Sequence, residues 1–178
     1  RLSARSEDPE LVLDPEILGD GKNPHYSLEV YRPSWDGRYV TYGVAQGGSE
    51  ETTYHVIDLN SGETLPDTLT NIETAYNRPQ WRLDNEGFFY SRRRDLPEDA
   101  AETEIYKQTQ VLYHHVGNDP AEDTLVAAYG LSDRLPLLDT DFPSIGITPG
   151  SDYAVLKVKH GDNNEISLFA AERSALLS

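Results

Sequence analysis

Pro-Ser-Trp-Asp-Gly-Arg-Tyr-Val-Thr-Tyr, residues Pro33–Tyr42, is a stretch of sequence that returns twice further along the chain. The copy at Pro79–Tyr90 keeps the proline, the tryptophan, a polar turn and the apolar run that follows. A weaker copy at Pro143–Leu156 has two apolar runs separated by a Pro-Gly-Ser-Asp turn. Asp tolerates a tight reversal and Gly accepts positive φ without steric cost. The repeat therefore predicts strand–turn–strand units.

Short runs rich in Val, Tyr, Phe, Thr and Ile surround these copies, whereas helical periodicity is nearly absent. The expected innermost strands are residues 27–32, 74–81 and 143–148. The expected second strands are residues 39–44, 88–92 and 153–159. The expected third strands are residues 53–58, 111–116 and 165–170. Units of about 40 to 50 residues with such turns are typical of four-stranded β-propeller blades.

The fold class expected from these repeats is all-β, a partial β-propeller of about three four-stranded antiparallel blades. Residues 1–24 form a lead-in segment, and residues 25–70 form the first blade. The second blade takes residues 71–130 and includes a charged insertion at 92–110. Residues 131–178 form a third, partial blade.

Composition narrows the function classes. The net charge of −16 repels phosphate backbones and anionic lipid, which excludes nucleic acid and membranes as expected partners. This acidity serves solubility or forms an acidic rim that attracts cationic peptides. No run approaches the roughly 18 apolar residues of a membrane-spanning helix, so we expect a soluble protein, cytoplasmic or periplasmic. A chain that starts at Arg1 and lacks Met is expected to be an internal or trimmed piece.

Catalytic and metal-binding patterns are absent from the sequence. Cysteine is missing, and no Gly-x-Ser-x-Gly nucleophile elbow occurs. The nearest match, Gly130–Arg134, fails at its last position. The five histidines show no metal-ligand spacing, and the adjacent His114 and His115 would point to opposite faces of a strand. Asp162–Glu165 is interpreted as a hairpin turn rather than a calcium loop. We therefore expect no catalytic residue, no metal and no cofactor in this chain.

Trp35 and Trp81 occupy matching positions just before the repeated turn. Such tryptophans could stack on a ligand, but a position that repeats with the architecture favours packing between blades.

Three further stretches carry a family resemblance. Leu11–Leu18, Gly87–Arg92 and Val111–Asn118, the last continuing to Glu122–Val126, occur in this order along the chain. Together they resemble the beginning of the propeller in the prolyl oligopeptidases, a family of serine peptidases. The resemblance implies a seven-bladed propeller, of which this chain holds about three blades. It also implies an α/β-hydrolase domain with a Ser-Asp-His triad, which this chain does not contain.

The resemblance also suggests two substrate-binding residues. It places an aromatic wall of the peptide pocket at Phe89, although a packed core phenylalanine is the alternative. Arg92, followed by Arg93 and Arg94, could face a channel and bind a peptide carboxylate, with a solvated loop as the alternative. The expected partners are short proline-containing peptides and the hydrolase domain of the same protein.

Three functions remain open at this stage. The first is a propeller fragment of a prolyl oligopeptidase-like serine endopeptidase, which gates and positions short peptides for a hydrolase domain absent from this chain. The second is a non-enzymatic β-propeller that binds proteins. The third is an aminopeptidase-type relative. In each case, blade faces without neighbours predict that the isolated chain self-associates.

Overall fold

Antiparallel strands make up most of the computed structural model, which describes residues 11–18, 25–49, 51–97 and 99–177. The strands are β1 (Tyr26–Pro33), β2 (Tyr39–Gln46), β3 (Thr52–Asp58), β4 (Glu63–Ile72), β5 (Gln80–Trp81), β6 (Gly87–Arg92), β7 (Gln110–His115), β8 (Thr124–Ala127), β9 (Asp141–Ile147), β10 (Tyr153–His160) and β11 (Ile166–Glu172). The helical elements are the short 3-10 segments η1 (Pro15–Leu18), η2 (Glu102–Tyr106), η3 (Pro120–Glu122) and η4 (Arg173–Ala175). The all-β expectation is confirmed.

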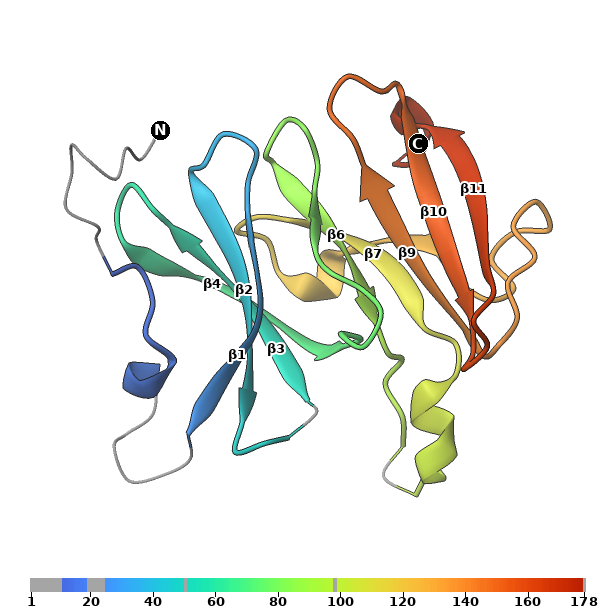
Figure 1. Ribbon diagram of the computed structural model, residues 1–178, viewed down its shortest axis with the longest axis horizontal. Coiled ribbons are helices and arrows are strands. Elements are labelled where there is room, and N and C mark those ends of the chain that lie inside the picture. The colour runs from blue at the N-terminus through green and yellow to red at the C-terminus, as the bar shows by residue number, and fades with distance from the viewer. Residues whose placement is uncertain (1–10, 19–24, 50, 98, 178) are drawn as a thin grey trace.

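The strands form three successive antiparallel groups that lie side by side (Figure 1). The first group is β1–β4, the second is β5–β8 and the third is β9–β11. A single residue pair, Ile72 with Arg92, joins the first two groups into one sheet. This arrangement is an open, partial propeller, as the repeats predict. The boundaries proposed between blades stay predictions, and most of the lead-in segment lies outside the described residues.

The expected second strands fall within β2, β6 and β10, but one innermost strand is much shorter than predicted. Of residues 74–81, only Gln80 and Trp81 pair with a neighbouring strand. The Glu73 carboxylate accepts hydrogen bonds from the Ala75 backbone N–H at 3.0 Å and from Asn77 Nδ2 at 2.8 Å. These side-chain bonds hold the segment in a turn, because they replace the regular ladder of a strand.

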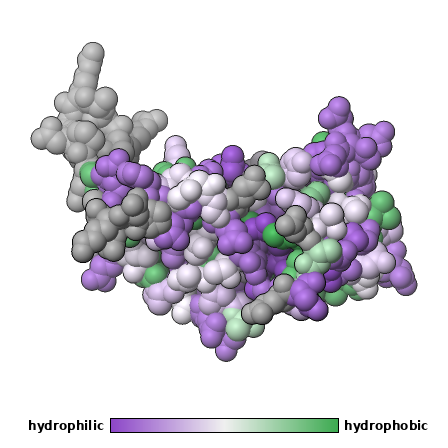
Figure 2. Space-filling view, turned by 90° about the horizontal axis from the view of Figure 1, so that it is seen from below, coloured by the Kyte–Doolittle hydropathy of each residue, from purple (hydrophilic) through white to green (hydrophobic). Residues whose placement is uncertain are grey.

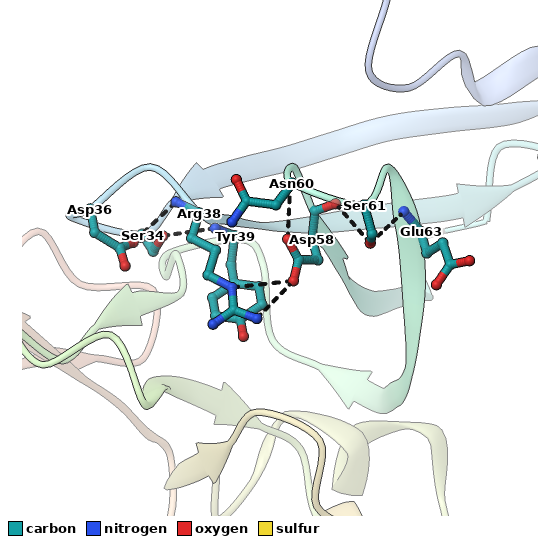
Figure 3. Close-up of polar contacts among 8 residues, drawn as sticks. All are labelled: Ser34, Asp36, Arg38, Tyr39, Asp58, Asn60, Ser61 and Glu63. Carbon is teal, nitrogen blue, oxygen red and sulfur yellow. Dashed lines mark hydrogen bonds and ion pairs between the residues drawn. The ribbon is translucent and has the colours of Figure 1, made fainter.

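The repeated turn contains a positive φ in all three copies, at Gly37 (74°), Asn85 (64°) and Gly150 (81°). In the first two copies this residue donates the N–H that closes the turn, whereas in the third copy the closing N–H belongs to the next residue, Ser151. In the first copy, Ser34 Oγ donates to Asp36 Oδ1 at 2.6 Å and accepts from the Tyr39 N–H at 2.9 Å (Figure 3). The predicted positive-φ reversal is therefore confirmed, with Asn replacing Gly in the second copy.

Core residues gather at the boundaries between groups. One cluster joins the first two groups and consists of Val30, Tyr54, Val56, Leu69, Ile72, Trp81, Phe88, Tyr90 and Leu112. A second cluster joins the last two groups and consists of Phe89, Val111, Tyr113, Ala127, Leu137, Ile145, Ile147, Ala154 and Val158. A small third cluster, Tyr42, Val44 and Ile57, lies on the other face of the first group, where Leu13 packs against it. Adjacent groups therefore bury the apolar faces that they turn toward each other.

The two tryptophans meet at the first boundary, but the prediction that they occupy matching positions is wrong. Trp81 pairs with Phe88 as Pro33 pairs with Val40, so Trp81 ends its strand while Trp35 lies two residues further on, in the turn. Trp81 Nε1 donates to the Arg32 carbonyl and Trp35 Nε1 donates to the Trp81 carbonyl, each at 3.0 Å. Trp81 is only 1% exposed, but Trp35 is 44% exposed. Both tryptophans thus contact the neighbouring group, as predicted, yet only Trp81 belongs to the core.

Seen from below, the surface is largely hydrophilic with separate apolar areas (Figure 2), in keeping with the high acidic content of the chain. Among the described residues, no helix has the length and apolar character required to cross a membrane.

Candidate functional site

Phe89 lies in the middle of β6 and faces the third group of strands. Its side chain is 2% exposed, and its ring centroid is 5.1 Å from that of Tyr113 in a tilted arrangement. It packs in the same cluster as Ile145 and Ile147 of β9. Phe89 therefore helps to bind the second group of strands to the third.

Phe89 also forms part of the wall of a cavity of about 710 Å³. The wall is mixed, because apolar residues alternate with Arg82, Asp84 and Arg173. Arg82 Nε pairs with Asp84 Oδ2 at 2.9 Å, and its guanidinium lies 5.8 Å from the centroid of the Tyr113 ring. This cavity is large enough for a few residues of an extended peptide.

Arg92, the second predicted substrate contact, lies at the end of β6 away from this cavity. Residues 89 and 92 are separated by three positions, so their side chains leave opposite faces of the strand. The Arg92 guanidinium bonds both carboxylate oxygens of Asp95, at 2.8 and 2.9 Å. The fold therefore does not bring Phe89 and Arg92 together, and it pairs Arg92 with a carboxylate of the chain itself.

A buried polar network joins the first two groups and was not foreseen from the sequence. His114 on β7 is 0% exposed, and its ring nitrogens contact Asp67 of β4 at 2.7 Å and Asp123 at 2.8 Å. Tyr90 Oη donates to the other oxygen of Asp123 at 2.8 Å, and the Gly117 N–H donates to Asp67 at 2.6 Å. The neighbouring His115 is exposed, which confirms that the histidine pair faces in opposite directions.

Both partners of His114 are carboxylates, which accept hydrogen bonds, so the geometry is satisfied when both ring nitrogens carry protons. Burial disfavours the charged ring, but the hydrogen bonds to Asp123 and Asp67 outweigh it and raise the pKa of His114 to about 9. Burial likewise opposes the charge of Asp67, but the contacts with His114 and Gly117 lower the pKa of its carboxyl group. We interpret the network as a charged clamp between β4 and β7 rather than as a reactive centre.

The sequence did hold one signal for this clamp. Alternation along a strand places His114 on the same face as Leu112, a core residue, which marks it as a histidine on an apolar face. The carboxylate partner, Asp67, lies 47 residues earlier, so only the packing of two groups reveals the pair.

No set of His, Asp or Glu side chains that could hold a metal ion occurs within the described part of the chain. The sequence contains no Gly-x-Ser-x-Gly nucleophile elbow. Fold and site together define an open, partial β-propeller with a cavity of about 710 Å³ beside Phe89.

Residues 1–134 match the family model described as the prolyl oligopeptidase N-terminal β-propeller domain. This match covers more than half of the chain. The chain therefore belongs to the prolyl oligopeptidase family of serine peptidases, and it represents the N-terminal part of the propeller.

Curated relatives agree with this assignment. Dipeptidyl aminopeptidase BI of Pseudoxanthomonas mexicana is 30% identical over 66% of this chain and 14% of its own length. A prolyl endopeptidase of Elizabethkingia miricola is 26% identical over 88% of this chain and 21% of its own length. The chain thus spans about a fifth or less of these relatives.

Solved structures share the fold. A structure from a study of two prolyl endopeptidases has a TM-score of 0.78 and 24% identity, and the match covers 97% of this chain and 24% of that one. Prolyl oligopeptidase B from Galerina marginata, bound to a 35mer substrate, has a TM-score of 0.74 and 19% identity. That match covers 89% of this chain and 22% of the other.

Proposed function

We propose that this chain supplies the first blades of a propeller that filters and positions short proline-containing peptides for a hydrolase domain of the same protein. The observation that carries the proposal is the match of residues 1–134 to the propeller domain of prolyl oligopeptidases, in a chain without a nucleophile elbow. A propeller without its own catalytic group can act on the reaction only through access and orientation.

Phe89 is the proposed aromatic wall of the peptide site. Its support is the cavity of about 710 Å³ that its side chain helps to line. Because Phe89 is also a core residue, the substitution that tests this role is Phe89→Leu, which keeps an apolar side chain. Phe89→Leu in the full-length protein is expected to raise KM for a proline peptide while the melting temperature changes by only a few degrees. Unchanged KM with a lower melting temperature would leave Phe89 a core residue alone.

Arg92 is the weaker of the two proposed contacts. To bind a peptide carboxylate, the Arg92 guanidinium would have to release the carboxylate of Asp95, which it contacts through two hydrogen bonds. Asp95→Asn would free Arg92 and is expected to strengthen binding of acidic peptides if Arg92 faces the peptide path. Arg92→Gln provides the matched control.

An aminopeptidase-type activity of the whole protein is the second candidate. It is favoured by the 30% identity with a dipeptidyl aminopeptidase, which exceeds the 27% and 26% identity with two prolyl endopeptidases. Peptides with free or acetylated N-termini separate the two activities, since an aminopeptidase requires the free amine and an endopeptidase cleaves both.

The filtering role is tested with the full-length protein and one proline cleavage site placed in peptides of increasing length, up to a small folded domain. We expect kcat/KM to fall steeply with peptide length. A small fluorophosphonate should nevertheless label the active serine, because it is smaller than any of the peptides. Equal kcat/KM for all lengths would contradict filtering. Failure of the whole protein to react with the fluorophosphonate would favour the non-enzymatic binding module.

A further inference from the structure

A groove runs along the edge of β1 that faces away from β2. Five consecutive residues, Leu28 to Arg32, line a cavity of about 300 Å³ together with Arg78. Successive strand residues point to opposite faces, so a cavity that touches all five must run along the edge of the strand. Among the described residues, β1 is the end strand of its sheet and its only strand partner is β2, while its Arg32 carbonyl accepts the hydrogen bond from Trp81 Nε1. The groove therefore follows an edge of β1 with which no other described strand pairs, and in which the Arg32 carbonyl is already bonded to Trp81.

Two cations in this groove lack acidic partners. In a chain with a net charge of −16, five of the nine described arginines are paired with a carboxylate. Arg38, for example, contacts Asp58 through Nε at 3.2 Å and through Nη2 at 3.0 Å (Figure 3). Arg32 and Arg78 are both exposed, and within the described ranges neither guanidinium has an ion pair or a hydrogen bond. Their charge is available for an anion from outside.

The other end of the groove has the opposite charge. Glu29 lies three residues before Arg32, about 10 Å away along an extended strand. Its carboxylate accepts a hydrogen bond from Ser27 Oγ at 2.6 Å, which directs it back along β1. The bulge between Leu28 and Val30 also interrupts the register at this end. A carboxylate is therefore repelled near Glu29 and attracted near Arg32, which gives the groove a direction.

We propose that this groove binds the C-terminal end of a peptide, with the terminal carboxylate held by Arg32 and Arg78 and the peptide backbone against the edge of β1. Guanidinium groups form strong charge-assisted bonds with carboxylates, and a free strand edge is a common place for an extended peptide to bind. Tyr31, which is 68% exposed, offers an apolar surface to the residue before the carboxylate. The assignment rests on the proposed role in peptide handling and names the chemical group that is recognised.

The test uses two peptides of identical sequence without proline, so that the hydrolase domain does not cleave them: an N-terminally labelled Ser-Gly-Ser-Gly-Ser with either a free carboxylate or a C-terminal amide. Their binding to the full-length protein is measured by fluorescence anisotropy. We expect the acid to bind about threefold to tenfold more tightly than the amide, because exposed charge pairs contribute modestly. Arg32→Gln combined with Arg78→Gln should bring both peptides to the affinity of the amide.

Arg134→Gln is the matched control, since Arg134 is also an exposed arginine without a described ion pair, but it lines no part of this groove. The control should keep the preference for the acid. Arg32→Lys should keep part of it, because charge remains and the two-pronged geometry is lost. Each variant is also compared with the wild type by thermal melting, which separates a loss of binding from a loss of folding.

Equal binding of acid and amide to the wild type would overturn the carboxylate site, as would a preference that survives the double substitution. Neither result would contradict the filtering role, which is tested separately by the dependence of kcat/KM on peptide length. Conversely, a flat length profile with an intact preference for the acid would remove the filter and keep the carboxylate site.

Discussion

The boundary between the first two groups of strands and the outer face of the third group are built from similar sequence but differ in environment. At the boundary, Tyr54, Trp81 and Phe88 are each at most 1% exposed. On the outer face, β10 and β11 expose Tyr153 (54%), Val155 (38%), Ile166 (54%) and Leu168 (64%). In both regions, the strands carry apolar side chains on both of their faces. The difference shows that an adjacent group, and not the strand itself, buries a blade face.

The two regions also treat charge differently. The boundary encloses His114 between Asp67 and Asp123 without exposure of the ring. Lys157 of β10 is partly exposed, and its Nζ donates to the carbonyl of Tyr76, just before β5, at 3.0 Å. The ring of His114 is therefore enclosed completely, whereas Lys157 remains in contact with solvent.

The largest effect is expected from Trp81→Ala at the boundary. This change removes a buried side chain and its bond to Arg32, and should lower the free energy of unfolding by about 3–5 kcal/mol. Trp35→Ala is the matched control, and with a 44% exposed ring it should cost about 1–2 kcal/mol. Urea denaturation of both variants measures the difference. Equal losses would mean that the exposed tryptophan stabilises the boundary as strongly as the buried one.

His114→Gln is expected to cost about 3 kcal/mol, because it leaves two buried carboxylates without their cation. His115→Gln, on the exposed neighbour, should have almost no effect on the free energy of unfolding. The comparison separates the clamp from the general contribution of β7. A His114→Gln protein as stable as the wild type would show that the clamp adds no stability.

The same clamp predicts a pH dependence. The pKa of His114 is raised to about 9 in the folded chain from 6.5, so the native state binds more protons than the unfolded state between these values. Its stabilisation is complete below pH 6.5 and is lost as the pH rises through about 9. Urea midpoints of the wild type should fall over this range relative to those of His114→Gln. Parallel profiles for the two proteins would argue against a charged His114.

The smallest effect on stability is expected on the outer face. Leu168→Ser combined with Ile166→Thr should change the free energy of unfolding by less than about 0.5 kcal/mol each, because both side chains are exposed. The pair should nevertheless weaken self-association of the isolated chain, since unpaired apolar faces favour contact between copies. Sedimentation at several concentrations measures this. A wild-type chain that stays monomeric at high concentration would contradict the prediction.

Local pattern was sufficient to predict much of the fold. The repeated turns and the second strands of each group depend on neighbours in sequence, through period-two alternation and positive φ at Gly37 and Gly150. The innermost segment before Trp81 was predicted too long, because the Glu73 side chain captures the backbone of that segment. A hydrogen bond from the backbone to a nearby side chain leaves no repeating pattern in the sequence. The alternation of apolar and polar residues therefore could not predict where the strand begins.

The candidate site was harder to predict from the sequence than the fold. The family resemblance suggested Phe89 and Arg92, and their spacing along a strand already places them on opposite faces, but the sequence did not indicate that Asp95 holds Arg92. The free arginines Arg32 and Arg78 were not selected at all. Ion pairs form between residues that are close in space. The sequence alone does not show which charged residues lie close enough to pair.

The sequence by itself determined the strand class, the turns and the family, because these follow from residue types at short, regular spacing. Only the tertiary structure decided which tryptophan is buried, that His114 is clamped by a carboxylate 47 residues earlier, and which face of the third group stays open. The physical reason is that burial and ion pairing are set by contacts between groups of strands, whose energies depend on distance in space and not on separation along the chain.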